Sequence, residues 1–241
     1  MEHVVYNGVD LAERFIVIGV ERPLPTPTPS MQLVHGGNRN FFKGMDFVPP
    51  TLSFRLVTKE LDRLRRRDEI HWLASVLLVD EPVKVQFSSD DGKWYKAVPT
   101  GDLAFHEYVK SGYLDVSLVC EQAAMYGTER KVSSNNGAVT FIVEGNTPTT
   151  LLIEAPSAVR ESNSDYRFGY TMDNGMVQYV EIDTNYNNVI MDGEKRRTTV
   201  NGTIRQLTLQ SDWFEVQPGT HTISRTLGSG EFTVSWNERW L

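Results

Sequence analysis

The sequence predicts a mainly β protein with two domains: an N-terminal α+β or β-sandwich domain with one helix and one hairpin, followed by an all-β sandwich. Three observations support this prediction. Between Leu52 and Val98 the apolar pattern changes from the two-residue period of a strand to a run of helix formers, and then back again. From Ala138 onward, short alternating segments and turn residues recur about every ten residues. A polar, glycine-containing segment separates the two parts.

Size and composition agree with a globular protein of this kind. The chain has 241 residues, of which 40% are hydrophobic and 23% charged, which suffices for two cores and excludes a disordered or membrane-embedded chain. The net charge is −7 and neither half is basic, which argues against a nucleic-acid-binding surface. We expect no signal peptide, because no basic n-region precedes the first apolar segment. The single cysteine, Cys120, excludes an intrachain disulfide and a cysteine-based zinc cluster, and indicates folding in a reducing cytoplasm.

The first elements are two strands and an unusual extended segment. His3–Tyr6 and Phe15–Val20 have strand character, and Asn7-Gly8 marks a turn after the first of them. Four prolines then occupy every second position from Pro23 to Pro29. This spacing predicts an extended, polyproline-like arm that makes no ladder hydrogen bonds of its own.

The arm continues into a glycine-containing stretch that is rich in large apolar residues. These are Met31, Phe41, Phe42, Met45 and Phe47. So many apolar side chains need a surface to lie on. Two interpretations remain open: the arm packs on its own domain, or it reaches a neighbouring subunit.

The central stretch predicts a strand, a helix and a hairpin. Alternation in Leu52–Val57 indicates the strand, and Thr58 is the expected N-cap of a helix that runs to about Leu78. Its apolar residues change face along its length, so we expect a kink or a break near Arg67-Asp68. Asp91-Gly92 then predicts a tight turn between two alternating segments. The second segment begins with Trp94 and Tyr95, which we take as candidates for contact with another molecule.

Two further strands and a linker complete the first half. Gly101–Val109 and Gly112–Cys120 both alternate, and the second places Cys120 on a buried face, where a thiol is inert. Met125–Gly137 is polar and punctuated by glycine, which is typical of an exposed linker. The predicted domains are therefore residues 1–130 and residues 131–241.

The second half contains no credible helix. Turn signals such as Asn201-Gly202 and Pro218-Gly219 separate its short segments, as in an antiparallel sandwich or jelly roll. The expected strands are Val139–Glu144, Leu151–Ala155, Tyr166–Tyr170, Met176–Ile182, Asn188–Met191, Thr203–Leu209, Trp213–Val216, Thr220–Thr226 and Glu231–Trp236.

No segment predicts catalysis or a cofactor. Asp183–Asn188 with Glu194 approaches the calcium-loop pattern, but Asn188 occupies the glycine position and the flanks are strand-like, so a hairpin with an Asn-rich turn is the favoured interpretation. The five histidines lack metal-ligand spacing, and nucleophile-elbow and phosphate-loop motifs are missing. We therefore expect neither a catalytic residue, a cofactor nor a metal.

The only basic run lies on the predicted helix. Arg63, Arg65, Arg66 and Arg67 are flanked by acidic residues. A solvated helix face is the favoured interpretation, and a contact with a subunit or with the lumen of an assembly is the alternative.

The order of these features resembles one family, the distal tail proteins (Dit) of bacteriophages with long, non-contractile tails (siphovirus type). Each motif is common by itself, and the order and spacing carry the resemblance over essentially the whole chain. The motifs are Val5-Tyr6-Asn7-Gly8, Ile70-His71-Trp72-Leu73, Trp94-Tyr95-Lys96-Ala97, Asp212 to Gly219, Phe232 to Trp236 and Arg239-Trp240-Leu241.

The resemblance implies a structural hub of the tail tip, or baseplate. Six N-terminal domains would close a ring around a channel for the tape measure and DNA, and galectin-like C-terminal β-sandwich domains would project outward. Residues of about 21–47 would form a belt that clasps the adjacent subunit. The implied subunit-interface candidates are Phe41, Phe42, Met45, Phe47, Trp94 and Tyr95.

The implied partners are further copies of the chain, with two rings back to back as one arrangement, the tail tube protein and a tail-associated protein. Receptor-binding or baseplate proteins are further candidates, whereas a membrane or a specific nucleic acid sequence is not expected. The protein would be made in the host cytoplasm and reside in the virion. An alternative function is a lectin-like receptor-binding module for a host cell-wall glycan. A stable homohexamer, which a closing head-to-tail interface produces, would distinguish the hub from the lectin.

Overall fold

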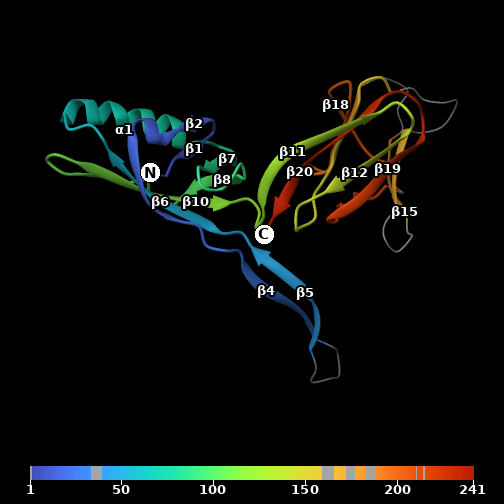
Figure 1. Ribbon diagram of the computed structural model, residues 1–241, viewed down its shortest axis with the longest axis horizontal. Helices are drawn as coiled ribbons and strands as arrows, with labels where there is room; N and C mark the ends of the chain where they lie inside the picture. Colours follow the sequence, from blue (N-terminus) through green and yellow to red (C-terminus); the bar gives the residue numbers. More distant parts are fainter. Residues whose placement is uncertain are drawn as a thin grey trace. The chain divides into compact units, whose positions relative to one another are not determined.

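The computed structural model describes residues 2–33, 40–158, 166–171, 177–182, 188–209, 211–213 and 215–241, and at residues 32, 33, 40 and 41 only the backbone. These residues divide into two compact units, Met1–Tyr126 with Leu241, and Gly127–Trp240. Each unit has its own hydrophobic core. Strands make up most of both units, so the prediction of a mainly β protein is confirmed (Figure 1).

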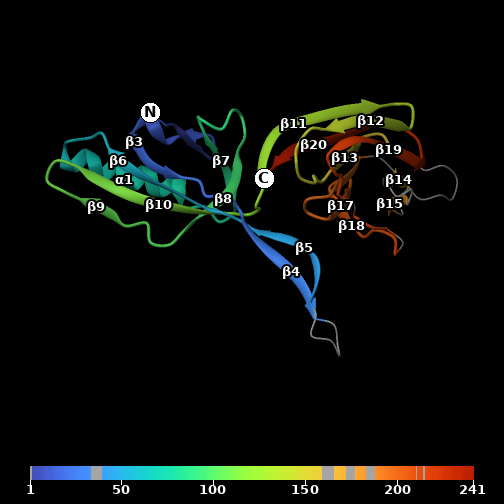
Figure 2. The same ribbon diagram turned by 60° about the horizontal axis from the view of Figure 1, so that its bottom comes forward.

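In the first unit, eight strands of the described chain form one antiparallel sheet with the order β2-β1-β7-β8-β10-β6-β3, and β9 also pairs with β10. The helix α1 (Arg63–Leu77) lies along this sheet (Figures 1 and 2). The strands are β1 (Val4–Tyr6), β2 (Val9–Asp10), β3 (Phe15–Glu21), β6 (Thr51–Thr58), β7 (Val83–Phe87), β8 (Tyr95–Thr100), β9 (Phe105–Glu107) and β10 (Gly112–Cys120), and a short 3-10 helix covers Leu11–Glu13.

Two turns of this sheet form where the sequence predicts them. Asn7 and Gly8 have φ of 50° and 80°, and Asp91 and Gly92 have φ of 46° and 81°. Positive φ at both central residues matches the twist of the flanking strands, and Asn, Asp and Gly tolerate it best. The predicted strand Gly101–Val109, in contrast, is reduced to β9.

The helix differs from its prediction in two ways. Its N-cap is Asp62, whose carboxylate accepts hydrogen bonds from the amides of Leu64 and Arg65, and Thr58 instead ends β6. The helix is also continuous through Arg67-Asp68, so the predicted kink or break is wrong. The change of apolar face has another cause: Leu64 is exposed, whereas Leu73 is buried against the sheet.

The buried face of the sheet follows the predicted alternation. Burial alternates regularly along β6 and β10, so that Leu52, Leu56 and Leu118 lie in the core of the first unit. Cys120 ends β10 as a buried free thiol. Burial raises the pKa of this thiol to about 12, which agrees with the expectation of an inert cysteine.

The proline-rich arm is a two-stranded antiparallel ribbon of β4 (Thr26–Leu33) and β5 (Asn40–Val48). The arm is extended, as expected, but the prediction that it makes no ladder pairs is wrong. Pro27 and Pro29 stand two residues apart, so both of their missing N–H groups face one edge of the ribbon, and the other edge remains able to pair with β5.

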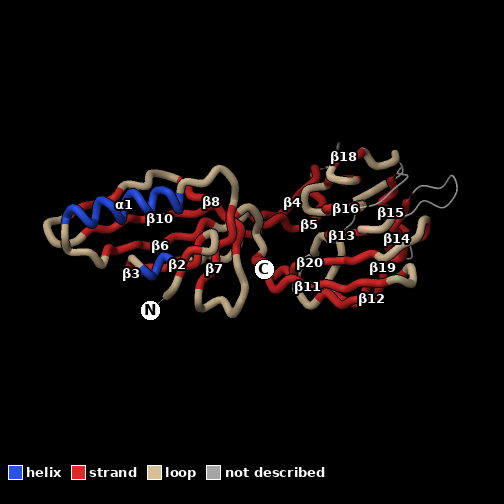
Figure 3. The backbone as a smooth tube through the Cα atoms, turned by 90° about the horizontal axis from the view of Figure 1, so that it is seen from above, coloured by secondary structure: helices blue, strands red, loops and turns tan. Residues whose placement is uncertain are grey.

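In the second unit, two antiparallel sheets of the described residues form a β-sandwich (Figure 3). One sheet has the order β11-β20-β13-β16-β17-β18, and the other has the order β12-β19-β14-β15. Phe141 and Trp236 come from different sheets, and their ring centroids lie 4.6 Å apart in the shared core. The strands are β11 (Met125–Ser134), β12 (Ala138–Val143), β13 (Leu152–Ala155), β14 (Tyr166–Thr171), β15 (Val177–Ile182), β16 (Val189–Asp192), β17 (Arg197–Val200), β18 (Thr203–Arg205), β19 (Gly219–Leu227) and β20 (Phe232–Trp240).

Three expectations for this half need correction. The segment interpreted as a linker, Met125–Gly137, is mostly the strand β11, which pairs with β20. Its charged residues are typical of an edge strand, where Lys and Glu protect the free edge from further pairing. The strand β17 was missed, and the expected strand Trp213–Val216 contributes one bridge between Val216 and Thr149.

The calcium-like segment requires a separate correction. Residues 183–187 lie outside the described residues, but the strands on either side of them are described. β15 pairs with β14 in one sheet, whereas β16 pairs with β13 and β17 in the other. The segment therefore joins the two sheets, and the predicted hairpin is wrong.

Candidate subunit-contact site

The β4–β5 ribbon has an apolar face and a polar face. Residues that stand opposite each other in an antiparallel ladder project to the same side. Pro27 stands opposite Phe47, and Pro29 opposite Met45. The next pairs on the polar side are formed by Thr28 with Asp46 and Ser30 with Gly44.

An irregularity extends the apolar face toward the tip of the ribbon. The register shifts between Ser30 and Met31, so that Lys43 is an extra residue and Met31 stands opposite Phe42. Without this bulge, Phe42 would project to the face opposite Met45, because side chains alternate along a strand. With it, Phe42, Met45 and Phe47 share one face with Pro27, Pro29 and Met31.

This apolar face is open to solvent in the single chain. The exposed fractions of Phe42, Met45 and Phe47 are 61%, 46% and 41%. Neither β4 nor β5 pairs with another strand of the described chain, and Figures 1 and 2 show the ribbon extending away from the large sheet of its unit. A lone two-stranded ribbon is at best marginally stable in water, so such a face is typical of an interaction surface.

The ribbon also protects one of its edges. The outer edge of β4 lacks the amide donors of Pro27 and Pro29, which prevents a further strand from pairing along it. The ribbon is therefore suited to contact through its apolar face and poorly suited to growth by strand addition at β4.

Of the candidate contact residues, four lie on this ribbon and two do not. Phe42, Met45 and Phe47 lie on the apolar face. The backbone of Phe41 pairs with that of Gln32, and the side chain of Phe41 is outside the described part. The β7–β8 hairpin carries the other two. Sequence alternation alone could not have grouped Phe42 with Met45, since the bulge is what aligns them.

The two aromatic residues of that hairpin are occupied within the first unit. Tyr95 is buried, and its ring contacts Phe87 edge-on at a centroid distance of 6.1 Å. Burial raises the pKa of Tyr95 to about 12. Trp94 stacks on Tyr126 at 4.4 Å, and the Lys84 ammonium lies 5.2 Å from its ring. Their main role in this structure is to pack the unit.

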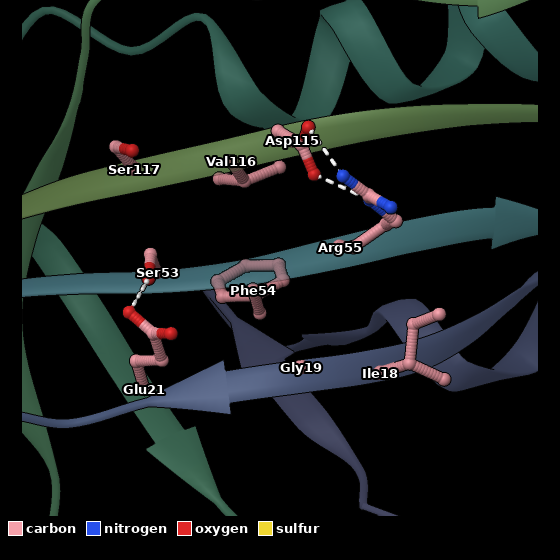
Figure 4. Close-up of a pocket in the computed structure, with 9 residues that line it drawn as sticks. All are labelled: Ile18, Gly19, Glu21, Ser53, Phe54, Arg55, Asp115, Val116 and Ser117. Carbon is pink, nitrogen blue, oxygen red and sulfur yellow. Dashed lines mark hydrogen bonds and ion pairs between the residues drawn. The ribbon is translucent and has the colours of Figure 1, made fainter.

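A hollow on the outer face of the large sheet is lined mainly by polar side chains (Figure 4). Arg55 donates two hydrogen bonds to Asp115, of 2.6 and 2.9 Å, and Ser53 donates one of 3.3 Å to Glu21. The Arg55 hydrogen bond holds the pKa of Asp115 below its usual value. Together with Ile18, Gly19 and Ser117 these residues line a shallow hollow of about 340 Å³. Arg55 and Asp115 thus neutralise each other, and the carboxylate of Glu21 is engaged by the Ser53 hydroxyl.

Other titratable groups serve structural roles. The buried Glu238 accepts hydrogen bonds from the amide of Gly145 (2.7 Å) and from the indole of Trp236 (2.9 Å). The buried His221 contacts Tyr170 and the carbonyl of Gln217 through its two ring nitrogens. Within the described residues, no group of three or more His, Cys, Asp or Glu side chains could hold a metal ion. No described helix is both long enough and apolar enough to cross a membrane.

The basic run divides into exposed and buried members. Arg63, Arg65 and Arg67 are exposed, as a solvated helix face requires. Arg66 departs from that interpretation, because only 1% of it is exposed and it contacts Glu107 at 3.3 Å.

Comparisons with known proteins connect this structure to phage tails. Residues 144–240 match the family model described as the siphovirus-type tail component, C-terminal domain. The crystal structure of SPP1 Dit, described as a paradigm of the hub adsorption apparatus in phages infecting Gram-positive bacteria, matches with a TM-score of 0.75 and 16% identity over 100% of both chains. Two structures of the phage p2 baseplate in its activated conformation, with Ca and with Sr, match with TM-scores of 0.61 and 8% identity, over 98% and 97% of both chains respectively. Curated protein sequences give no match.

These matches define the class of protein first: the fold and the C-terminal domain are those of a siphovirus-type tail component. Within that class, the family match over residues 144–240 and the shared fold confirm the resemblance to the distal tail proteins, the Dit family, that was found in the sequence. The protein has a structural role in the phage tail or baseplate, and it is a component of the virion.

Proposed function

We propose that this chain is the hub of the tail tip, where six copies close a ring that joins the tail tube to the host-adsorption apparatus. The first unit forms the ring around a channel for the tape measure and DNA, and the β4–β5 ribbon of each copy clasps its neighbour. The tail tube protein and a tail-associated protein are its further partners, and the second unit offers attachment points for adsorption proteins. The observation that carries this proposal is the exposed apolar face of the ribbon.

The energetics favour a covered ribbon. Burying a large apolar side chain contributes about 1.5 to 3 kcal/mol. Phe42, Met45 and Phe47 together could therefore contribute several kcal/mol at each contact, part of which offsets the entropy lost on association. A contact between two different surfaces of identical copies repeats around a closed ring. Each copy therefore places its ribbon on one neighbour and receives the ribbon of the other neighbour.

The test compares the assembly of two double variants with that of the unchanged protein. The unchanged chain should have the mass of six times 27.4 kDa by light scattering. F42S with F47S should yield a folded monomer with unchanged far-ultraviolet dichroism. The matched control is T28S with D46S, which changes an opposing pair on the polar face of the same ribbon and should leave the ring intact.

Other outcomes would contradict the proposal. A chain that stays monomeric at all concentrations and instead binds a cell-wall glycan would favour the lectin-like alternative. If F42S with F47S unfolds the first unit, the apolar face belongs to its own core. If the variant assembles like the unchanged protein, the ribbon is not the clasp.

A further inference from the structure

The exposed side of α1 carries a line of basic residues beside a hollow. Arg63, Arg67 and His71 follow one another at intervals of four residues and so lie on one stripe of the helix. With Leu64, Ile70 and Glu107 they line a hollow of about 610 Å³. We call these six residues the basic groove. Leu64 is 76% exposed, so the groove offers an apolar contact as well as positive charge.

The charges of the groove are not balanced within the first unit. The carboxylate of Glu107 contacts both Arg63, at 3.4 Å, and Arg66, at 3.3 Å. The Nε and Nη1 atoms of the buried Arg66 have no hydrogen-bond partner in the described part of the chain, and no described ion pair involves Arg67. One carboxylate thus faces two guanidinium groups, and a buried guanidinium without a full set of partners is costly.

The position of these charges is unfavourable for the helix itself. The N-terminal turn of a helix carries a partial positive charge and stabilises acidic residues, yet the first turn of α1 has no acidic residue and contains Arg63 and Arg65. Like charges four residues apart, as at Arg63 and Arg67, also destabilise an isolated helix. An external anionic partner would remove both costs.

The opposite end of the same helix carries the complementary surface. Beyond the last helical residue, Leu77, the exposed side chains are Leu78, Asp80 and Glu81. We call these three residues the acidic corner. Leu78 is 70% exposed, and no ion pair of the described residues involves Asp80 or Glu81. A helix of this length separates the two ends by about 22 Å, so the corner cannot fold back onto the groove of its own copy.

We propose that the basic groove of one copy receives the acidic corner of the next copy. The pairing places two carboxylates against Arg63 and Arg67 and lets Leu78 approach Leu64. It joins two different surfaces of the same chain, which is the head-to-tail type of contact that can close into a ring. This inference rests on the proposed ring, and it assigns to that ring a second contact that is independent of the β4–β5 ribbon.

Charge reversal on each side, and on both sides together, tests the pairing. R63E with R67E, or D80K with E81K, should weaken assembly at low salt by about tenfold or more, because attraction becomes repulsion. The four changes together should restore assembly, since the pairing is re-formed with the signs exchanged. The effects should diminish at high salt, where exposed charges are screened. R65E is the matched control for R67E, because Arg65 is exposed on the same helix but lies off the stripe.

The outcomes separate this inference from the proposed function. If the unchanged protein forms the ring and R63E with R67E forms it equally well, the pairing is wrong and the ring stands. The same conclusion follows if the fourfold variant stays as weakened as either double variant. If the unchanged protein never assembles with itself, both the ring and the pairing are overturned. Unchanged far-ultraviolet dichroism of each variant establishes that a loss of assembly is not a loss of folding.

Discussion

At the scale of single residues, one side chain decides where α1 begins. The sequence predicts Thr58 as the N-cap, because its hydroxyl precedes a run of good helix formers, but the aspartate at position 62 is an equally suitable residue type. In the structure Thr58 donates a hydrogen bond to Glu69 and accepts one from the amide of Glu60, so its hydroxyl is engaged elsewhere. Asp62 accepts from two amides of the first turn, both through its Oδ1 atom.

The Asp62 N-cap should make the stability of the protein depend on pH. The hydrogen bonds that Asp62 accepts, first from the amide of Arg65 and then from that of Leu64, lower the pKa of its carboxyl in the folded state. Stability gained in this way is present above the unfolded-state pKa and is lost as the pH falls through the folded-state pKa. D62A should therefore lower the thermal midpoint at pH 7 and do so less at pH 3. D62N keeps the cap without the titration, and should be less destabilising than D62A at pH 7. Equal effects of both substitutions at both pH values would show that Asp62 is not the cap.

At the scale of elements, α1 is held by its second half. Leu73 and Leu77 are buried, and Trp72 stacks on Phe15 of β3 at a centroid distance of 6.3 Å. In the first half, Leu64 is exposed and Arg66 takes the inward position. The change of apolar face that suggested a kink therefore separates an N-terminal half with exposed apolar side chains from a C-terminal half that packs on the sheet.

This arrangement predicts an asymmetric response to truncation along the helix. L73A removes buried contacts and should lower the free energy of unfolding by about 2 to 5 kcal/mol. L64A removes an exposed side chain, so it should change that free energy little. Urea unfolding of the full chain, followed by tryptophan fluorescence, measures both. A similar loss for the two substitutions would mean that the helix packs along its whole length.

The elements also indicate how far sequence reasoning reaches. Alternation found β6 and β10, because one face of each is buried and the other exposed, and Asp91-Gly92 found a hairpin. The sequence pattern did not reveal β11, since a charged edge strand has the composition of a linker. It also missed the bulge that aligns Phe42 with Met45, because a bulge depends on the partner strand. The sequence could therefore name candidate contact residues, but it could not show that Phe42 and Met45 share a face.

At the scale of the whole molecule, the fold persists although few residues do. The match to SPP1 Dit covers all of both chains at 16% identity. Such similarity is expected where a fold depends on the placement of apolar positions and turns, which many sequences satisfy. Function then depends on surfaces, and the surfaces proposed to join copies all belong to the first unit: the apolar ribbon face, the basic groove and the acidic corner.

The last prediction follows from that division. A fragment of residues 1–126 contains the ribbon, the basic groove and the acidic corner, whereas a fragment of residues 127–241 contains the β-sandwich with its own core. We expect both fragments to fold, because each unit has its own hydrophobic core, and we expect only the first to assemble. Light scattering of each fragment should give a multiple of the chain mass for residues 1–126 and a monomer for residues 127–241. Protease should also spare residues 127–134, because β11 is paired with β20. Assembly of the second fragment by itself would transfer the ring contacts to the β-sandwich, and it would leave the exposed apolar face of the ribbon without its proposed partner.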